Sequence, residues 1–101
     1  MEKNKTFEYC KECVLSCLNK GQENAVTQDY IKALTGISRR HIRLIIHELR
    51  QEGHPICSTS YDGYWLAANK EEIDYCLMHI KAQINTLNTT VIALRKAKKN
   101  L

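Results

Sequence analysis

The chain has 101 residues, and its 15 Lys and Arg side chains exceed its 11 Asp and Glu side chains by a formal net charge of +4. A chain of this length forms one small domain with at most one appended element, which argues against a large catalytic cleft. The mildly basic balance is compatible with nucleic acid as a partner but does not by itself indicate one.

The sequence has no sign of membrane insertion or secretion. No apolar run approaches the roughly 20 residues of a membrane span, and the N-terminal residues lack the apolar core of a signal peptide. The five cysteines are an odd number, which argues against a complete set of internal disulfides. We therefore expect a cytoplasmic protein with reduced thiols and no membrane partner.

Residues 7–18 are predicted to form the first helix, with one apolar face. Three cysteines on this helix have a spacing that would also suit a metal site or a thiol sensor, but a fourth ligand is not evident. Free cysteine packs as a small apolar side chain, so we favour core packing and predict no metal and no cofactor. The apolar face comprises Phe7, Cys10, Val14, Cys17 and Leu18, and the three cysteines are Cys10, Cys13 and Cys17.

A second, short helix is predicted after Thr27, whose hydroxyl suits an N-cap. Tyr30, Ile31 and Leu34 are expected to form its buried side. Gly36 follows directly and allows a sharp turn, because glycine adopts positive φ without steric cost. Ile37 is expected to insert into the core at this turn.

The third predicted helix, residues 38–52, begins at the N-cap Ser38 and combines an apolar face with a basic one. Gly53 ends it, and the proline two residues later prevents its continuation. The segment from residue 38 to residue 47 contains three arginines and no carboxylate. The apolar face is Ile42, Ile45, Ile46 and Leu49, and the basic side chains are Arg39, Arg40, Arg43, His47 and Arg50.

A β-hairpin is predicted over residues 56–66. Residues 56–58 and 64–66 have the composition of short strands, and Asp62 and Gly63 between them are expected to supply the positive φ values of a tight turn. Because two strands alone are marginally stable, the hairpin must pack on the helices, with Tyr64 and Trp65 as anchors.

A long helix is predicted from Asn69 to the end of the chain. Asn69 and Glu72 resemble a capping box, and no Gly or Pro follows. Apolar residues alternate four and three apart over about four heptads, which predicts a coiled-coil-like dimerisation helix. Packing back on its own domain is the alternative, and the poor helix formers of residues 85–90 allow for a break. The dimerisation residues are Ile73, Leu77, Ile80, Ile84, Leu87, Val91 and Leu94.

The predicted fold is therefore mainly α with a small β-hairpin: a winged helix-turn-helix head over residues 1–68 and a C-terminal helix over residues 69–101. In this fold the third helix enters the major groove and the hairpin, or wing, lies beside it. Arginine near the start of that helix can bind guanine bidentately. The predicted DNA-binding residues are Lys32, Ser38, Arg39, Arg40, His41, Arg43, His47, Arg50, Thr59 and Tyr61.

Three short motifs carry a resemblance to a known family. These are the Ser-Arg opening of the third helix with its Leu-Arg-x-x-Gly ending at residues 49–53, and the Gly-Tyr-x-Leu close of the hairpin at residues 63–66. About half of the chain resembles the DNA-binding domain at the N-terminus of biotin repressors. Compact proteins of similar layout occur in phages and mobile elements. The resemblance implies a three-helix core, a two-stranded wing and DNA contact through Ser38, Arg39, Arg40 and Arg43. The chain departs from the family in having a coiled-coil-like helix in place of a ligase or effector domain, so we do not expect biotin binding or a small-molecule signal.

We therefore expect a homodimeric transcriptional regulator that binds an inverted repeat in double-stranded DNA. The alternative is a phage-type module that binds and inhibits a host replication, transcription or defence protein. The modest net charge and the absence of Lys and Arg from the wing favour it. Nothing in the sequence has the pattern of a phosphate-binding loop, a metalloprotease helix or a nucleophile elbow, so we expect no enzyme activity.

Overall fold

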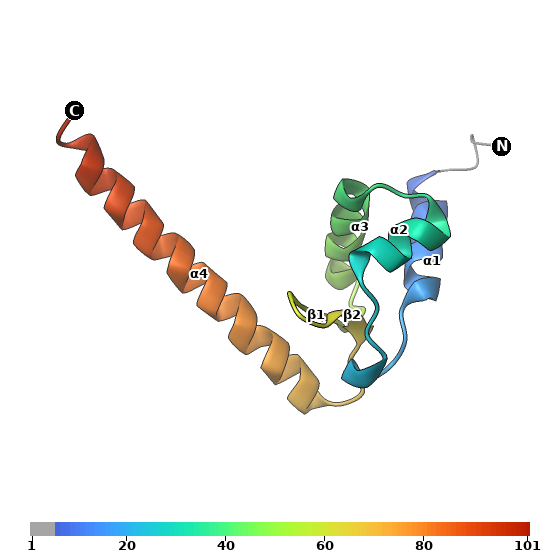
Figure 1. Ribbon diagram of the computed structural model, residues 1–101. Coiled ribbons are helices and arrows are strands. Elements are labelled where there is room, and N and C mark those ends of the chain that lie inside the picture. Colours follow the sequence, from blue (N-terminus) through green and yellow to red (C-terminus); the bar gives the residue numbers. More distant parts are fainter. Residues whose placement is uncertain (1–5) are drawn as a thin grey trace.

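Figure 1 shows the computed structural model, which describes residues 6–101 as a small head and a long projecting helix. The predicted fold class is confirmed: the chain is mostly helical, with one antiparallel hairpin and a long C-terminal helix. The elements are α1 (Phe7–Cys17), the short 3-10 helix η2 (Gln22–Asn24), α2 (Gln28–Thr35), α3 (Arg39–Gln51), β1 (Ile56–Thr59), β2 (Gly63–Leu66) and α4 (Lys70–Lys98).

The core of the head is formed by α1, α2, α3 and β1. All four predicted apolar residues of α3 are buried, and Ile37 is buried at the turn before it, as expected. The periodic spacing of these side chains places them on one side of α3, against α1 and α2. The core residues are Val14, Leu18, Ile31, Ile37, Ile42, Ile45, Ile46, Leu49 and Ile56.

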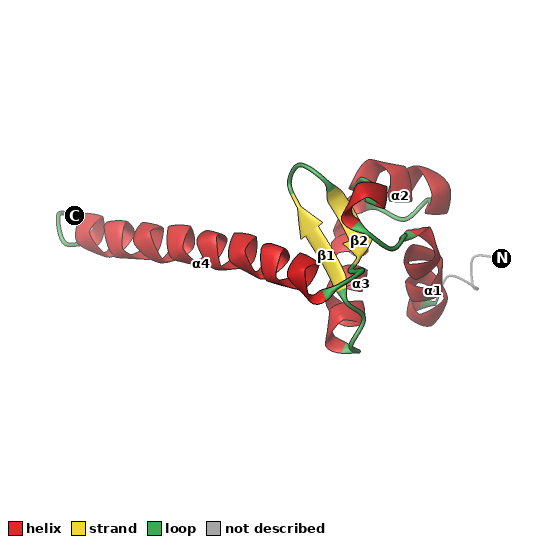
Figure 2. Cartoon of the chain, turned by 90° about the horizontal axis from the view of Figure 1, so that it is seen from below, coloured by secondary structure: helices red, strands yellow, loops and turns green. Residues whose placement is uncertain are grey.

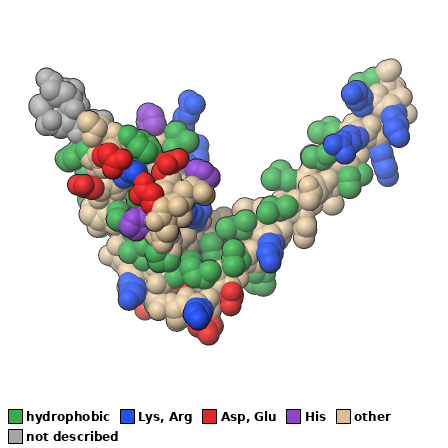
Figure 3. Space-filling view, turned by 180° about the vertical axis from the view of Figure 1, so that it is seen from behind, with side chains coloured by type: hydrophobic (Ala, Val, Ile, Leu, Met, Phe, Trp, Pro, Cys, Tyr) green, Lys and Arg blue, Asp and Glu red, His purple; other side chains and the backbone are tan. Residues whose placement is uncertain are grey.

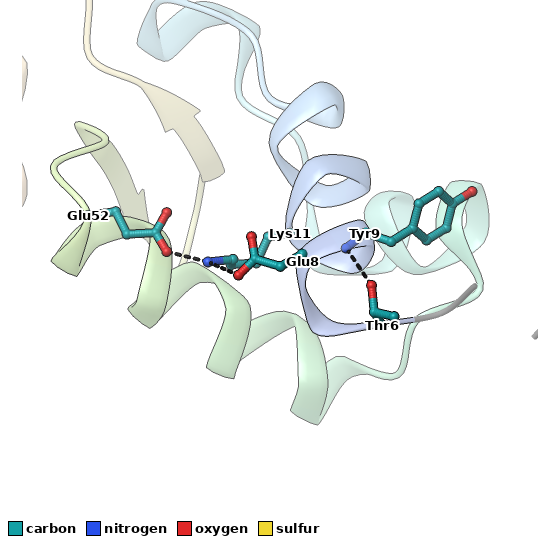
Figure 4. A network of polar contacts seen from close by, with 5 residues as sticks. All are labelled: Thr6, Glu8, Tyr9, Lys11 and Glu52. Carbon is teal, nitrogen blue, oxygen red and sulfur yellow. Dashed lines mark hydrogen bonds and ion pairs between the residues drawn. The ribbon is translucent and has the colours of Figure 1, made fainter. Parts of the chain in front are cut away.

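The apolar face of α1 differs from the prediction at its first turn. Val14 and Leu18 are buried, but Phe7 lies at the rim of the core and is 47% exposed. Lys11 is buried instead, because its aliphatic stem packs inside while its amine reaches two carboxylates. Figure 4 shows the amine between Glu8, 3.2 Å away, and Glu52 at the end of α3. The hydrogen bond to Glu52 raises the pKa of Lys11.

The prediction for the buried side of α2 was wrong at two of three residues. Ile31 is fully buried, whereas Tyr30 and Leu34 are 49% and 60% exposed. Successive residues on a helix are 100° apart, so Tyr30 and Leu34 lie about 100° and 60° from Ile31 on the same side of it. An eight-residue helix that contacts α1 and α3 through one narrow face buries only the central residue.

The hairpin is extended by a third segment that the sequence did not indicate. β1 and β2 pair antiparallel with Ser58 opposite Tyr64, and Val26 exchanges two backbone hydrogen bonds with Tyr64 on the other side of β2. A Cβ at Gly63 would overlap the carbonyl oxygen of Val26, and Gly63 has φ +94°. Asp62 does not have the predicted positive φ: the turn spans residues 60–62, and within the hairpin only Gly63, at the start of β2, has a positive φ.

A second cluster joins the hairpin to the start of α4. Trp65 and Cys57 are fully buried against Cys76, and Ile73 and Ile80 of α4 pack around them. Asn69 caps α4 by accepting a hydrogen bond from the Glu72 amide at 3.0 Å. The predicted return bond of a capping box is replaced, because the Glu72 carboxylate accepts instead from the Ala68 amide and the Trp65 indole, both at 2.9 Å.

Beyond residue 80, α4 leaves the head and continues without a break (Figure 2). Every residue from 81 to 98 is exposed, so the helix neither folds back on its own domain nor breaks at residues 85–90. The described part of the chain contains no helix with the length and apolar character needed to cross a membrane.

Candidate nucleic-acid interface

The turn between α2 and α3 fixes the angle at which α3 is presented. Thr27 caps α2 by accepting a hydrogen bond from the Tyr30 amide at 3.1 Å. Gly36 adopts φ +75° and donates its amide to Lys32 at 2.8 Å, which ends α2 in a left-handed turn. Burial of Ile37 then fastens the turn to the core. As a result α3 lies on the side of the head nearest α4 (Figure 1).

Ser38 and His41 are both used at the start of α3. The Ser38 hydroxyl accepts a hydrogen bond from the His41 amide at 3.2 Å, which confirms the predicted N-cap. The same hydroxyl lies 3.1 Å from Nδ1 of His41. Both residues are exposed, and Nδ1 of His41 is engaged with the cap.

The outer face of α3 is formed by Arg40, Arg43, Leu44 and His47. Their spacing places Arg40, Leu44 and His47 in one stripe opposite the buried isoleucines, with Arg43 beside it. All four are exposed, and within residues 6–101 no ion pair involves Arg40 or Arg43. In Figure 3, Arg, Lys and His side chains gather on the side of the head that faces α4. The outer face of α3 is therefore a basic surface without ion pairs to Arg40 or Arg43 in the described chain, and its width is that of one helix.

Leu44 is a residue of this face that the sequence analysis missed. It is 51% exposed, whereas the neighbouring Ile45 and Ile46 are buried. The helical spacing could have identified it, because Leu44 is the one apolar side chain of α3 that falls outside the buried face, between Arg40 and His47.

Arg39 differs from the two arginines that follow it. Its Nε and Nη2 atoms lie 2.7 and 2.6 Å from Oδ1 of Asp29 on α2. The pair is exposed and joins the two helices of the turn. An approaching phosphate or base would have to compete with this carboxylate, so Arg39 presents less free positive charge than Arg40 or Arg43.

Arg50 is engaged within the chain. Its Nε donates to the Ile56 carbonyl at 2.8 Å, and its Nη2 donates to the Ser58 hydroxyl at 3.0 Å. The guanidinium therefore ties the end of α3 to β1, and a contact of Arg50 with DNA would have to compete with these two hydrogen bonds.

The wing contains few free donors for phosphate. The Thr59 hydroxyl donates to the Asp62 carboxylate at 2.7 Å, and Gln22 donates to the same carboxylate at 3.1 Å. The carboxylate places negative charge in the turn. Tyr61 is 92% exposed at the tip, and Lys32 is exposed on α2, so these two predicted residues remain accessible.

A groove of about 620 Å³ runs between the wing and α4. Hydroxyl and amide side chains dominate its lining, including Ser58, Tyr64, Gln83 and Thr86. His79 of α4 lies at this groove, and its Nε2 atom is buried without a hydrogen-bond partner. The His79 ring packs edge-on against Tyr75, with centroids 4.6 Å apart.

The cysteines do not converge on a metal site. Across the described residues, no three His, Cys, Asp or Glu side chains are placed to hold a metal ion. Burial raises the pKa of the Cys57 thiol to about 12, and the neighbouring Cys76 adds to the shift. Cys57 therefore stays protonated and packs beside Trp65 as an apolar side chain.

Comparisons with protein-family models, curated proteins and solved structures found no match to this chain.

Proposed function

We propose that this chain is a sequence-specific DNA-binding protein that acts as a homodimeric transcriptional regulator. The observation that supports the proposal is the outer face of α3, where Arg40 and Arg43 are exposed without an ion-pair partner among the described residues. The major groove of DNA is about 12 Å wide and admits one α-helix, and arginine bridges the two acceptors of guanine there.

The other residues of the face have matching chemistry. His47 can donate to a base edge, and the exposed Leu44 suits the methyl group of thymine. Ser38 and His41 at the start of α3 and Lys32 on α2 are exposed and would contact phosphates, which fix orientation without reading sequence. The wing would contribute mainly through Tyr61, because its Thr59 and Asp62 bond to each other.

The homodimer is supported by α4, whose apolar residues beyond position 80 are exposed. Two heads related by a twofold axis favour an inverted repeat, with half-sites about 34 Å apart or a multiple of that distance. Two linked heads also bind DNA more tightly than one, because the second contact becomes intramolecular.

The test is the double substitution Arg40→Ala and Arg43→Ala, with binding measured on sequences selected from a random DNA pool. We expect about a hundredfold loss of affinity and a shallower salt dependence, because two arginine contacts to bases or phosphates disappear. The matched control removes two exposed lysines that lie outside both α3 and the apolar stripe of α4, Lys20→Ala and Lys96→Ala, and should lose far less. Unchanged binding by the arginine variant would refute the proposal.

A second candidate function is a protein-interaction module that blocks a host protein. Tyr9, Tyr30 and Leu34 are 46%, 49% and 60% exposed around a pocket of about 410 Å³ between α1 and α2. Exposed aromatic side chains of this kind are typical of protein interfaces. If Tyr30→Ala with Leu34→Ala abolished capture of one specific host protein while no DNA was bound, this candidate would replace the first.

A further inference from the structure

The apolar stripe of α4 has no covering surface within the described chain. Ile84, Leu87, Val91 and Leu94 are 50%, 64%, 44% and 65% exposed. Figure 3 shows apolar side chains along the side of α4 that faces the head. A heptad stripe of this length requires a partner helix, and a second copy of α4 carries the same stripe.

Charge is distributed very unevenly along α4. After Lys70, the first turns contain Glu71, Glu72 and Asp74, whereas the last turns contain Arg95, Lys96 and Lys98, followed by Lys99. With Leu77, Ile84 and Val91 at heptad position a, Lys98 occupies the fourth a position. The basic end therefore brings a cation into the apolar seam itself.

Parallel pairing would place like charges together. Lys98 would face Lys98 of the second copy within the seam, and the eight basic residues of the two ends would lie at one end of the pair. The flanking g and e positions would bring no opposite charges together in compensation. The facing g and e residues are Cys76 with Lys81, Gln83 with Asn88, and Thr90 with Arg95.

In one register, antiparallel pairing separates the two Lys98 side chains and places the two basic ends at opposite ends of the pair. With Ile84 opposite Leu87 of the second copy, Lys98 lies beside Ile73 instead of another lysine. The e positions then face each other and bring Asp74 next to Arg95, twice by symmetry. Asp74 is exposed, and no ion pair within residues 6–101 involves it.

Neighbouring antiparallel registers are disfavoured. A shift by one heptad in one direction brings Lys81 next to Arg95, and a shift in the other direction brings Lys81 next to Lys81 of the second copy. Like charges at these flanking positions disfavour both registers. The charge pattern thus selects one orientation and one register together.

We propose that two copies of this chain pair antiparallel through α4, with Ile84 opposite Leu87 and Asp74 beside Arg95. Ile73 and Ile80, half-buried against their own head, take part in both packings. This inference rests on the homodimer of the proposed function. It places the two heads at opposite ends of the paired helices and brings the basic end of each α4 to the other copy's head.

The direct test is a distance between two spin labels attached enzymatically to the C-terminal Leu101, which leaves the native cysteines untouched. In the antiparallel pair the labels lie about 45 Å apart, from the 1.5 Å rise per residue. In a parallel pair they lie within about 20 Å, because paired helix axes are 8–10 Å apart. A short distance overturns this inference and leaves the dimer standing. A monomeric mass in sedimentation equilibrium overturns both.

A charge exchange tests the register independently. Asp74→Arg and Arg95→Asp should each raise the dimer dissociation constant about tenfold, and the double variant should recover most of that loss. The matched control is Glu71→Arg with Lys96→Asp, which changes the same helix ends on the outer face. Recovery in the first pair and none in the control supports the register, whereas simple additivity in both pairs overturns it.

Discussion

The head and the distal half of α4 have equally regular apolar patterns, but the apolar face is buried in the head and exposed in α4. In α3, all four residues of the predicted apolar face are buried, because α1 and α2 cover them. In α4, no residue from 81 to 98 is buried. Amphipathic periodicity therefore predicts that a helix face will be buried. Whether another part of the same chain or a partner buries it depends on the topology of the chain.

The two regions should therefore differ in whether their stability depends on protein concentration. The head has an internal core, so its unfolding should not depend on protein concentration. The distal half of α4 buries no residue within the chain, and an isolated helix of that length is marginally stable in water. Its order should depend on association with a partner, and hence on concentration.

The largest expected effect tests the junction between the two regions. Trp65 is fully buried between the hairpin and α4, and its indole donates to Glu72 at 2.9 Å. Trp65→Ala should lower the free energy of unfolding by about 3–5 kcal/mol, because a large cavity forms. Urea denaturation followed by circular dichroism measures the loss. Tyr61→Ala, on the same hairpin but 92% exposed, should change it by less than about 0.5 kcal/mol.

The next effect should be confined to the distal half of α4. Ile84→Glu with Val91→Glu places charge in the apolar stripe and should raise the dimer dissociation constant at least about a hundredfold. The head should keep its urea midpoint, because neither residue packs in its two apolar clusters. Sedimentation equilibrium measures the mass.

The control for this variant lies on the outer face of the same turns. Asn85→Glu with Ile92→Glu adds the same charge one residue further along at each site and should leave the mass unchanged. An unchanged mass in the Ile84 and Val91 variant would mean that the stripe is not the dimer interface.

The smallest effect is a pH dependence at the start of α4. Hydrogen bonds from the amides of Ala68 and Gln22 and from the Trp65 indole lower the pKa of Glu72. A lowered pKa stabilises the fold above the unfolded value of about 4.3, and this contribution is lost as the pH falls through the folded value.

Glu72→Gln should therefore destabilise the protein at pH 6, and its difference from the native chain should shrink as the pH falls below about 4.3. Urea midpoints across this range measure the difference. Glu71→Gln, at the neighbouring exposed position, provides the control. A difference that stays constant with pH would mean that the Glu72 charge does not stabilise the junction.

Much of the fold follows from local chemistry and could be predicted from the sequence. Thr27, Ser38 and Asn69 each cap a helix as expected, because the capping bond lies within three residues. The apolar face of α3 and the hairpin also depend on short-range spacing. All of these features depend on interactions between residues that are close in the sequence.

The remaining features depend on contacts between distant segments. Lys11 is buried because Glu52, 41 residues away, lies beside it, and β2 gains a third neighbour because Val26 reaches Tyr64. In the candidate site, Arg39 pairs with Asp29 and Arg50 binds Ser58, so two predicted DNA ligands are engaged. No local pattern encodes these partnerships, whereas Arg40 and Arg43 stay exposed as their spacing predicts.

In the proposed antiparallel pair, the unbroken length of α4 would fix the distance between the two heads. The 29 residues of the helix span about 43 Å without Gly or Pro, so the distance between two heads would be set by counting residues. One inserted heptad would add about 10 Å, which corresponds to about three base pairs and roughly a third of a turn of DNA. The helix would thus determine both how far apart two half-sites lie and on which side of the duplex each head meets its own.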